Sequence, residues 1–516
     1  MSAPAGDTSS GTVRSLIPAR MDRLPWTRFH WLVVISLGIT WILDGLEIQI
    51  VATVGSVLQQ SETFDLSSAQ VGLTASVYLA GEVVGALLFG RLSDRMGRRN
   101  LFIFTLALYL FASGLAGLSL NVWMFYAFRF IAGMGIGGEY AAINSAIDEL
   151  IPANYRGRVD IAINGTYWAG AALGAFAQIF LLNPDLVPIE WGWRIGFFIG
   201  PVIGVLIWGL RKNLPESPRW LLTHGRVDEA ERTVAEIEEQ VRRQGGVLRP
   251  VTDDEALEVR PSEASVTYRQ IARTMLRDYP SRSVLGLTMM VTQAFLYNAI
   301  FFTYAIVLTQ FYGVSAGLIP YFFFPFCLGN LLGPLVLGTL FDTIGRRKMI
   351  AFTYCVSALL LAVTGYLFEI GVLSAVTQTI LWCVIFFLAS AGASSAYLTV
   401  SEIFPLELRA QAISFFFAIG QLAGGVLAPY LFGVLIGEGT DRTPLMYGYL
   451  LGAALMFLGG AVAWFLGVDA ERTSLEDVAT PLTTADVLPR QRDHGPDSSI
   501  DPDEAGGTTP SGTGTS

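Results

Sequence analysis

The sequence predicts an all-α integral membrane protein in which twelve transmembrane helices form two six-helix bundles. Of the 516 residues, 52% are hydrophobic and only 15% are charged, whereas soluble domains carry about 25% charged residues. Apolar stretches of about twenty residues follow one another, and each is long enough to cross a bilayer as a helix. The two halves of the chain also share short motifs, which indicates that one membrane-embedded half has been duplicated.

The duplication is clearest in two motifs that lie between apolar stretches. The pattern Gly-x-x-x-Asp-x-x-Gly-Arg-Arg occupies residues 90–99 and returns at 338–347. A second pattern, Glu-x-x-Pro-x-x-x-Arg, occupies residues 149–156 and returns at 402–409. Parallel repeats around a central site are typical of secondary transporters.

The apolar stretches set the bounds of the predicted spans and domains. The twelve spans are expected at 30–57, 69–90, 100–119, 122–147, 159–182, 191–211, 284–311, 316–338, 349–368, 375–401, 410–436 and 444–467. The predicted domains are a cytoplasmic tail 1–29, an N-terminal bundle 30–211, a cytoplasmic central loop 212–283, a C-terminal bundle 284–467 and a disordered cytoplasmic tail 468–516.

The basic residues of the short loops predict the orientation in the membrane. Loops after even-numbered spans hold many arginines, whereas the loop 58–68 has neither Lys nor Arg. Because positively charged loops stay in the cytoplasm, both termini are expected there, with the protein in the cell's inner (plasma) membrane. In the central loop, Val234, Ile237 and Val241 recur at helical spacing, which predicts an amphipathic surface helix over Val227–Arg243.

The residue content argues against several classes of protein. The three cysteines form no CxxC pair and the three histidines are scattered, so a disulfide framework or a metal site is not expected. A basic patch with interleaved aromatics, the mark of nucleic-acid binding, is missing, as is the Gly-x-x-x-x-Gly-Lys loop of ATP-driven pumps. We therefore expect a monomer in the lipid bilayer that is not an enzyme and has no cofactor.

Charged side chains inside the spans are costly and count as functional candidates. At about 1.5 Å per helical residue, Asp44 and Arg129 fall at the same depth of a core about 30 Å thick. We expect these two residues to form an ion pair that couples transport to protons, although the pair could instead only fix helix packing. Glu47 and Glu82 are further proton-site candidates, Glu82 with packing as its alternative, and Glu139 is expected to be structural.

Amide and aromatic side chains at mid-depth are candidate substrate ligands. Amides both donate and accept hydrogen bonds, and aromatic rings offer stacking faces, although packing inside a bundle is an equal alternative for any one of them. The candidates are Asn164, Tyr167, Trp168, Gln293, Tyr297, Asn298, Tyr397 and Gln421.

The repeated motifs predict a conformational gate at the cytoplasmic ends of the bundles. Their acids recur together with their bases, so ion pairs and contacts with helix dipoles can hold these ends together until the protein opens inward. The alternative is that the arginines only set the topology. The gate residues are Gly90, Asp94, Arg95, Gly97, Arg98, Arg99, Glu149, Arg156, Gly338, Asp342, Gly345, Arg346, Arg347, Glu402 and Arg409.

Taken together, the motifs make the chain resemble a major facilitator superfamily transporter over residues 30–467. The repeated loops resemble the superfamily signature after spans two and eight, and Arg129-x-x-x-Gly133-x-Gly135-x-Gly137 resembles its fourth-span motif. Resemblance to the sugar-porter branch is carried by Pro-Glu-Ser-Pro-Arg-Trp-Leu at 215–221, Gln-x-x-x-x-Asn at 293–298 and Ser-Glu-Ile-Phe-Pro at 401–405. The resemblance implies a two-bundle fold that works by alternating access.

The chain departs from sugar porters at positions where that family grips sugar. Asn164 stands where those proteins have Gln, and Tyr397 stands where they have Trp. Asp44-Gly45-Leu46-Glu47 instead resembles the first span of proton-coupled aromatic and organic acid transporters, and the best placement is among metabolite–proton symporters similar to synaptic vesicle proteins. We therefore expect symport of protons with a small organic solute.

The substrate expected first is a monocarboxylic or aromatic acid, and the alternative is a sugar or polyol. A drug-type exporter is a further transport alternative. From a different class, a non-transporting membrane sensor would have lost the gate motifs and Asp44, which are intact here.

Overall fold

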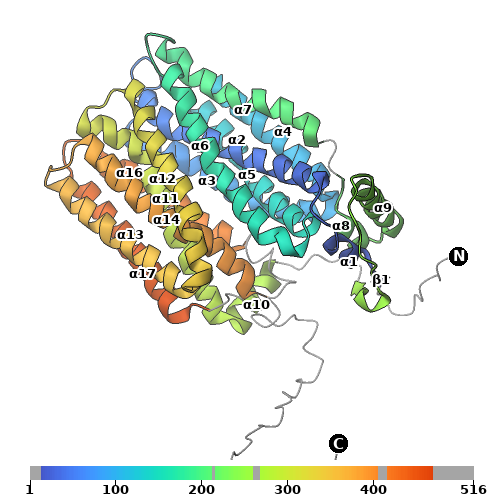
Figure 1. Ribbon diagram of the computed structural model, residues 1–516. Helices are drawn as coiled ribbons and strands as arrows, with labels where there is room; N and C mark the ends of the chain where they lie inside the picture. Colours follow the sequence, from blue (N-terminus) through green and yellow to red (C-terminus); the bar gives the residue numbers. More distant parts are fainter. Residues whose placement is uncertain (1–12, 212–214, 260–267, 405–414, 469–516) are drawn as a thin grey trace, which may run out of the picture.

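The computed structural model describes residues 13–211, 215–259, 268–404 and 415–468, and Figure 1 shows two groups of long helices lying side by side. The first group, coloured blue to green, comes from the N-terminal half. Its helices are α2 (Arg28–Leu58), α3 (Ser68–Met96), α4 (Arg98–Gly117), α5 (Val122–Leu150), α6 (Ala153–Leu181) and α7 (Ile189–Arg211).

The second group, coloured yellow to red, comes from the C-terminal half. Its last-but-one helix, Phe415–Ile436, includes a π-helical segment, η3 (Gln421–Val426), followed by α16 (Leu427–Ile436). The other helices of this group are α11 (Pro280–Tyr312), α12 (Ile319–Thr343), α13 (Arg346–Glu369), α14 (Ala375–Ile403) and α17 (Thr443–Leu466). The described residues thus form twelve long helices in two bundles of six, as the sequence predicts.

Nine helices within the described residues are long and apolar enough to cross a membrane. Large apolar side chains such as Phe111, Val205 and Phe465 are exposed on the outside of the bundles, where lipid would cover them. A helix satisfies its backbone hydrogen bonds within itself, and for this reason it can cross a bilayer. The protein is therefore a multi-pass integral membrane protein.

Some helices extend beyond the predicted apolar spans. Helix α3 continues through the first copy of the repeated motif to Met96, and Gly97 then separates it from α4 with a backbone φ of +87°. In the second copy, Gly345 separates α12 from α13 with a φ of +113°. The second glycine of the motif is thus explained, because a positive φ is strained for other residues.

Glycines bring α3 and α5 into backbone contact. A Cβ atom placed at Gly137 would lie 2.0 Å from the backbone oxygen of Glu82, and one at Gly85 would lie 2.0 Å from that of Met134. Small residues permit such close approach in lipid. These helices carry Glu82 and Arg129, so their spacing sets the geometry of the buried charges.

We expect Gly137→Ala to push α3 and α5 apart and to lower the free energy of unfolding by about 1–3 kcal/mol, the usual cost of overpacking. Thermal unfolding in detergent, followed by tryptophan fluorescence, measures the loss. Gly165→Ala is the matched control, because a Cβ atom there meets nothing within 4 Å and alanine favours helix. A melting temperature as high for Gly137→Ala as for Gly165→Ala would contradict the close packing.

The bundles contact each other at the end where α2 connects to α3. The Ser68 hydroxyl donates to the backbone oxygen of Gly437 at 2.7 Å. The helices also approach each other closely at Gly72 and Gly433, because Cβ atoms added there would lie 2.2 and 2.4 Å from backbone oxygens of the opposite bundle. This end of the interface between the bundles is therefore closed.

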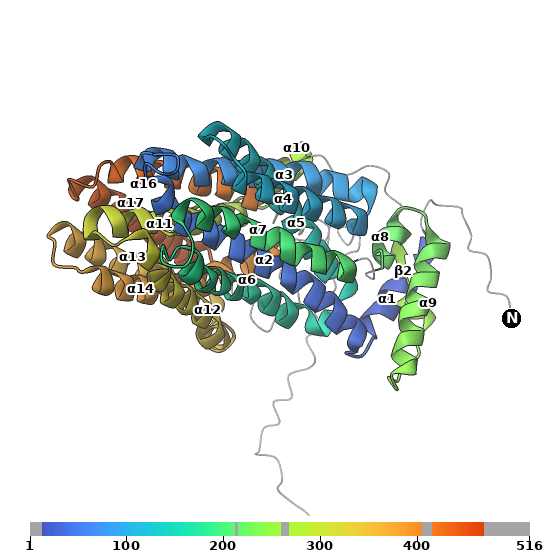
Figure 2. The same cartoon turned by 90° about the horizontal axis from the view of Figure 1, so that it is seen from above.

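A small cap covers the opposite end of the N-terminal bundle, beside the start of α2 (Figure 2). Strand β1 (Val13–Ser15) pairs antiparallel with β2 (Leu257–Val259), and α1 packs against α8 and α9. The helices of the cap are α1 (Ile17–Asp22), α8 (Pro218–Thr223) and α9 (Val227–Arg243), and short helices η1 (Asp253–Glu255), α10 (Tyr268–Asp278) and η2 (Ala316–Leu318) complete the described chain.

Candidate functional site

Among the described residues, five charged side chains are buried inside the helices of the N-terminal bundle: Asp44, Glu47, Glu82, Arg129 and Glu139. Arg129 is fully buried, and its Nη1 donates to Glu47 Oε1 at 2.6 Å. Its guanidinium carbon lies 4.0 Å from the centre of the Tyr78 ring. The predicted pairing of Arg129 with Asp44 is therefore wrong, because Glu47 is the ion-pair partner. Asp44 and Glu47 are less than one helical turn apart, which is finer than a depth estimate resolves.

Asp44 is held by tyrosines instead of arginine. The Tyr78 hydroxyl on α3 donates to Asp44 Oδ1 at 3.4 Å, and the Tyr140 hydroxyl on α5 donates to Oδ2 at 3.5 Å. Asp44 is 2% exposed. Both contacts are long for O–H···O bonds, so the carboxyl is held loosely by its two hydroxyl partners.

Glu82 connects the two bundles. The Gln421 amide nitrogen donates to Glu82 Oε2 at 3.0 Å, and the Gln421 oxygen accepts a bond from Asn298 Nδ2 at 3.2 Å. Asn298 also donates to the backbone oxygen of Ala294 at 2.8 Å. Two of the predicted substrate ligands, Asn298 and Gln421, thus form a hydrogen-bond chain with a predicted proton site.

Several of the other predicted ligands lie where α6 faces α11. The Trp168 ring lies 6.0 Å from the rings of both Tyr297 and Phe301, measured between centroids. Tyr167 packs against Trp168 at 5.0 Å, and Gln293 is buried in α11. The side chains of Asn164 and Tyr397 lie outside the described residues.

Two aromatic residues that the sequence analysis did not single out also join the bundles. The Tyr140 ring stacks on Phe417 of the opposite bundle with centroids 4.9 Å apart and an interplanar angle of 26°. Trp41 packs edge-on against Tyr140 at 4.3 Å. A signal was available in the sequence, since Tyr140 follows the buried acid Glu139 and Phe417 precedes Gln421 by one helical turn.

Two residues of the gate motifs, Arg99 and Arg347, make hydrogen bonds within the described part of the chain. The backbone N–H of Arg99 donates to both carboxylate oxygens of Glu216 at 3.3 Å. Glu216 belongs to the Pro-Glu-Ser-Pro segment and therefore places an acid at the start of α4, where the helix dipole favours negative charge. Arg347 Nε donates to the backbone oxygen of Trp464 at 2.5 Å within its own bundle.

The remaining gate residues fall into two groups. Gly90, Gly338 and Arg346 lie within the described helices, and a Cβ atom at Gly338 would meet nothing within 4 Å. The ion pairs predicted for the other gate residues involve side chains outside the described part of the chain. These are the side chains of Asp94, Arg95, Arg98, Glu149, Arg156, Asp342 and Glu402, and the whole of Arg409.

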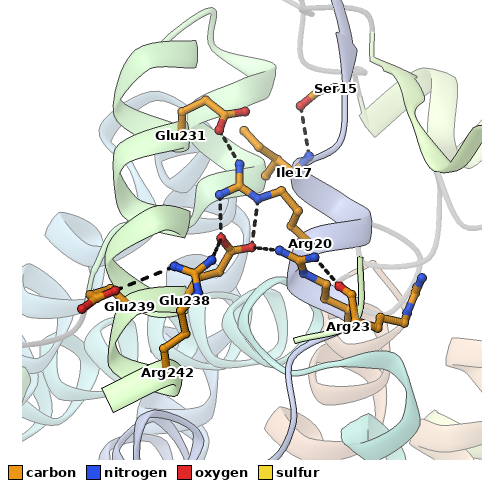
Figure 3. A network of polar contacts seen from close by, with 9 residues as sticks. Ser15, Ile17, Arg20, Arg23, Glu231, Glu238, Glu239 and Arg242 are labelled. Atoms are coloured by element: carbon orange, nitrogen blue, oxygen red, sulfur yellow. Dashed lines mark hydrogen bonds and ion pairs between the residues drawn. The ribbon is translucent and has the colours of Figure 1, made fainter. Parts of the chain in front are cut away.

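Figure 3 shows the ion-pair network that fastens the N-terminal segment to α9. Arg20 donates to both oxygens of Glu238 at 3.0 Å, and Arg23 Nη2 donates to Oε1 at 2.5 Å. Arg20 also pairs with Glu231. Burial raises the pKa of the Glu238 carboxyl, but hydrogen bonds from Arg20 and Arg23 outweigh it and hold that pKa below its ordinary value.

This lowered pKa predicts how the cap depends on pH. The contribution of the ionised Glu238 carboxylate to the stability of the cap is fully present above its ordinary pKa of 4.5. This contribution is lost as the pH falls through the lowered pKa. We expect residues 13–24 to be protected from hydrogen exchange at pH 7, relative to the intrinsic exchange rate at the same pH, and to lose this protection below that value. Glu238→Gln should give fast exchange already at pH 7, whereas Glu236→Gln is the matched control. Slow exchange in Glu238→Gln would contradict the role of this network.

Known membrane transporters are similar to this chain over most of its length. The niacin transporter NiaP of Acinetobacter baylyi is 26% identical over 466 residues, which cover 89% of this chain and 99% of that protein. The putative metabolite transport protein YdjK of Escherichia coli is 29% identical over 483 residues, with coverage of 89% and 96%. The crystal structure of a D-xylose-proton symporter matches with a TM-score of 0.66 at 18% identity, covering 86% of this chain and 99% of that one.

The sugar (and other) transporter family matches residues 34–480, which is most of the chain. The two bundles, the repeated motifs and the structural match agree with this assignment. The chain therefore belongs to the sugar (and other) transporter family of the major facilitator superfamily, and it is a membrane transporter of small solutes and not an enzyme.

Proposed function

We propose that the protein couples the movement of protons to the uptake of a small organic acid by alternating access. The observation that carries the proposal is the excess of buried acid. Asp44, Glu47 and Glu82 are each at most 2% exposed, and Arg129 is the one buried arginine or lysine among the described residues of the helical bundles. Because an isolated charge is costly in a bilayer, these four side chains together are neutral only when two of the three acids hold protons.

Two of these acids are placed where a proton could change the protein's conformation. Glu82 contacts Gln421 of the opposite bundle, and Asp44 contacts Tyr140, which stacks on the opposite bundle. Glu47 is paired with Arg129, so this pair is expected to set the electrostatic background of both sites. The structural likeness to a D-xylose-proton symporter supports proton coupling.

An acid with an aromatic ring fits the residues between the bundles best. Trp168, Tyr297 and Phe301 offer aromatic rings. The Gln421 amide nitrogen has a second N–H for a carboxylate beside the one that it donates to Glu82. The similarity to a niacin transporter favours the same substrate class. A sugar or polyol is the second candidate, because amides also bind hydroxyls and the matched structure belongs to a xylose symporter.

Thermal unfolding of the purified protein tests the substrate class. A true ligand present at 100 times its dissociation constant stabilises the folded state by about 2.7 kcal/mol. We expect aromatic monocarboxylates to raise the melting temperature and pentoses to leave it unchanged, and Trp168→Leu should remove the increase. Phe176→Leu, at an exposed aromatic residue on the same helix, is the control. Stabilisation by pentoses alone would favour the second candidate.

We further propose that both termini are cytoplasmic and that the repeated motifs close the cytoplasmic end. The arginine-rich loops support this orientation. Reporter fusions after residues 60, 250 and 480 should report outside, inside and inside. If the motifs form a gate, Asp94→Asn should increase cysteine accessibility on the cytoplasmic side without impairing insertion. Unchanged accessibility with unchanged transport would leave the motifs only a role in topology.

A further inference from the structure

We propose that Tyr140 is the residue through which Asp44 controls contact between the two bundles. This inference rests on the proposed proton coupling and names the side chain that carries it. Tyr140 touches both partners at once, because its hydroxyl lies 3.5 Å from Asp44 Oδ2 and its ring stacks on Phe417 at 4.9 Å. Trp41 packs edge-on against the same ring at 4.3 Å. The ring is thus held between Trp41 of its own bundle and Phe417 of the other.

The chemistry of the Asp44 carboxyl decides how firmly Tyr140 is held. An ionised carboxylate only accepts hydrogen bonds, and a bond to a charged acceptor is about twice as strong as a neutral one. Ionised Asp44 therefore holds the Tyr140 hydroxyl, and with it the ring that stacks on Phe417, more firmly than protonated Asp44 does. Protonation weakens this bond and frees the ring, so the contact between the bundles is lost more easily.

Phe417 lies on the helix segment that Glu82 also contacts. Phe417 and Gln421 are four residues apart and share one face of their helix, and Gln421 donates to Glu82 at 3.0 Å. Both buried acids thus act on a single segment of the C-terminal bundle, Asp44 through a ring and Glu82 through an amide. The π-helical segment begins at Gln421, so it starts at the residue that contacts Glu82 and one helical turn after Phe417.

Other titratable groups surround Asp44 and enter the same equilibrium. Glu47 on α2, Tyr78 and Glu82 on α3, and Glu139 on α5 interact with it electrostatically. Tyr109 on α4 and Tyr167 on α6 do so as well. Arg129 is paired with Glu47. Glu82 accepts a hydrogen bond from Gln421 of the C-terminal bundle. It therefore offers a second route from a buried acid to that bundle, which the test has to distinguish from the route through Tyr140.

Distances between spin labels measure the separation of the bundles without any substrate. Phe104 on α4 and Phe352 on α13 are both about half exposed and lie six residues from the starts of equivalent helices, so cysteines there can carry the labels in a background without native cysteines. In the otherwise unmodified protein, we expect the label distance to increase as the pH falls. Tyr140→Phe keeps the ring but should abolish this change, and Phe417→Ala should give the separated state at every pH.

Tyr126→Phe is the matched control, because it removes a hydroxyl from the same helix that donates to the Gln70 backbone oxygen and not to an acid. This control should keep the full response to pH. A Tyr140→Phe protein that responds like the control would overturn the inference and leave proton coupling intact, and loss of the response in Gln421→Leu alone would assign it to Glu82. An unmodified protein without any response to pH would overturn both proposals.

Discussion

Replacing Arg129 with alanine is expected to abolish transport and to lower the free energy of unfolding by about 3–5 kcal/mol, the usual cost of breaking a buried ion pair. The variant leaves Glu47 without the partner that now donates at 2.6 Å, in a site where neither side chain contacts solvent. We expect both accumulation of substrate and exchange across an equilibrated membrane to fail. Thermal unfolding and assays in proteoliposomes measure the two effects separately.

A double variant distinguishes a coupling role from a structural one. When both members of a buried ion pair are replaced by apolar residues of similar volume, stability is often restored or increased. Glu47→Leu combined with Arg129→Leu should therefore recover the melting temperature while transport stays absent. Full transport by the stable double variant would show that the pair only fixes the packing of α2 against α5.

The sequence predicts the helices well because each span must satisfy one simple condition. A bilayer requires about twenty apolar residues in a row, and this requirement is visible without knowledge of the packing. The ends of the helices are less predictable, since α3 runs to Met96 and α6 begins at Ala153, before its predicted span. Polar ends of a helix can leave the membrane, so apolarity does not mark where they stop.

The site could be predicted as a set of residue types but not as a set of pairs. The cost of burying charge identified Asp44, Glu47, Glu82 and Arg129 as candidates. Whether Asp44 or Glu47 faces Arg129 depends on how α2 is oriented about its own axis. That orientation is set by packing against several helices and cannot be predicted from one sequence. The contact of Glu82 with Gln421 joins residues 339 positions apart, and one sequence carries no signal for it.

The cap was missed for a related reason. Residues 13–24 are polar enough to be interpreted as a tail, yet Ile17, Met21 and Leu24 are buried against α8 and α9. Their spacing of three to four residues is helical, but a pattern of only three residues is too short to predict a helix. The segment packs on the amphipathic helix α9, whose buried side also supplies Glu238 as the partner of Arg20.

Replacing Asp44 with asparagine is expected to abolish accumulation of substrate while sparing exchange across an equilibrated membrane. Asparagine keeps one oxygen that can accept from Tyr78 or Tyr140 and places its amide nitrogen beside the other hydroxyl, but it cannot bind and release a proton. The carrier can then still change conformation with substrate bound, whereas the proton gradient no longer favours one direction. Uptake into proteoliposomes with and without a pH gradient measures both activities in the same preparation.

Asp441→Asn is the matched control, because that carboxylate lies in an exposed loop, where it accepts a bond from the backbone N–H of Thr443 at 2.9 Å. It should accumulate substrate normally. If Asp44→Asn also accumulates substrate with an ordinary pH dependence, the proton site lies elsewhere, and Glu82→Gln becomes the decisive variant. Glu82 is preferred over Glu47 in that case, because a ligand or proton drives a conformational change only through different affinities for the two states. The contact of Glu82 crosses between the moving bundles, whereas that of Glu47 stays within one.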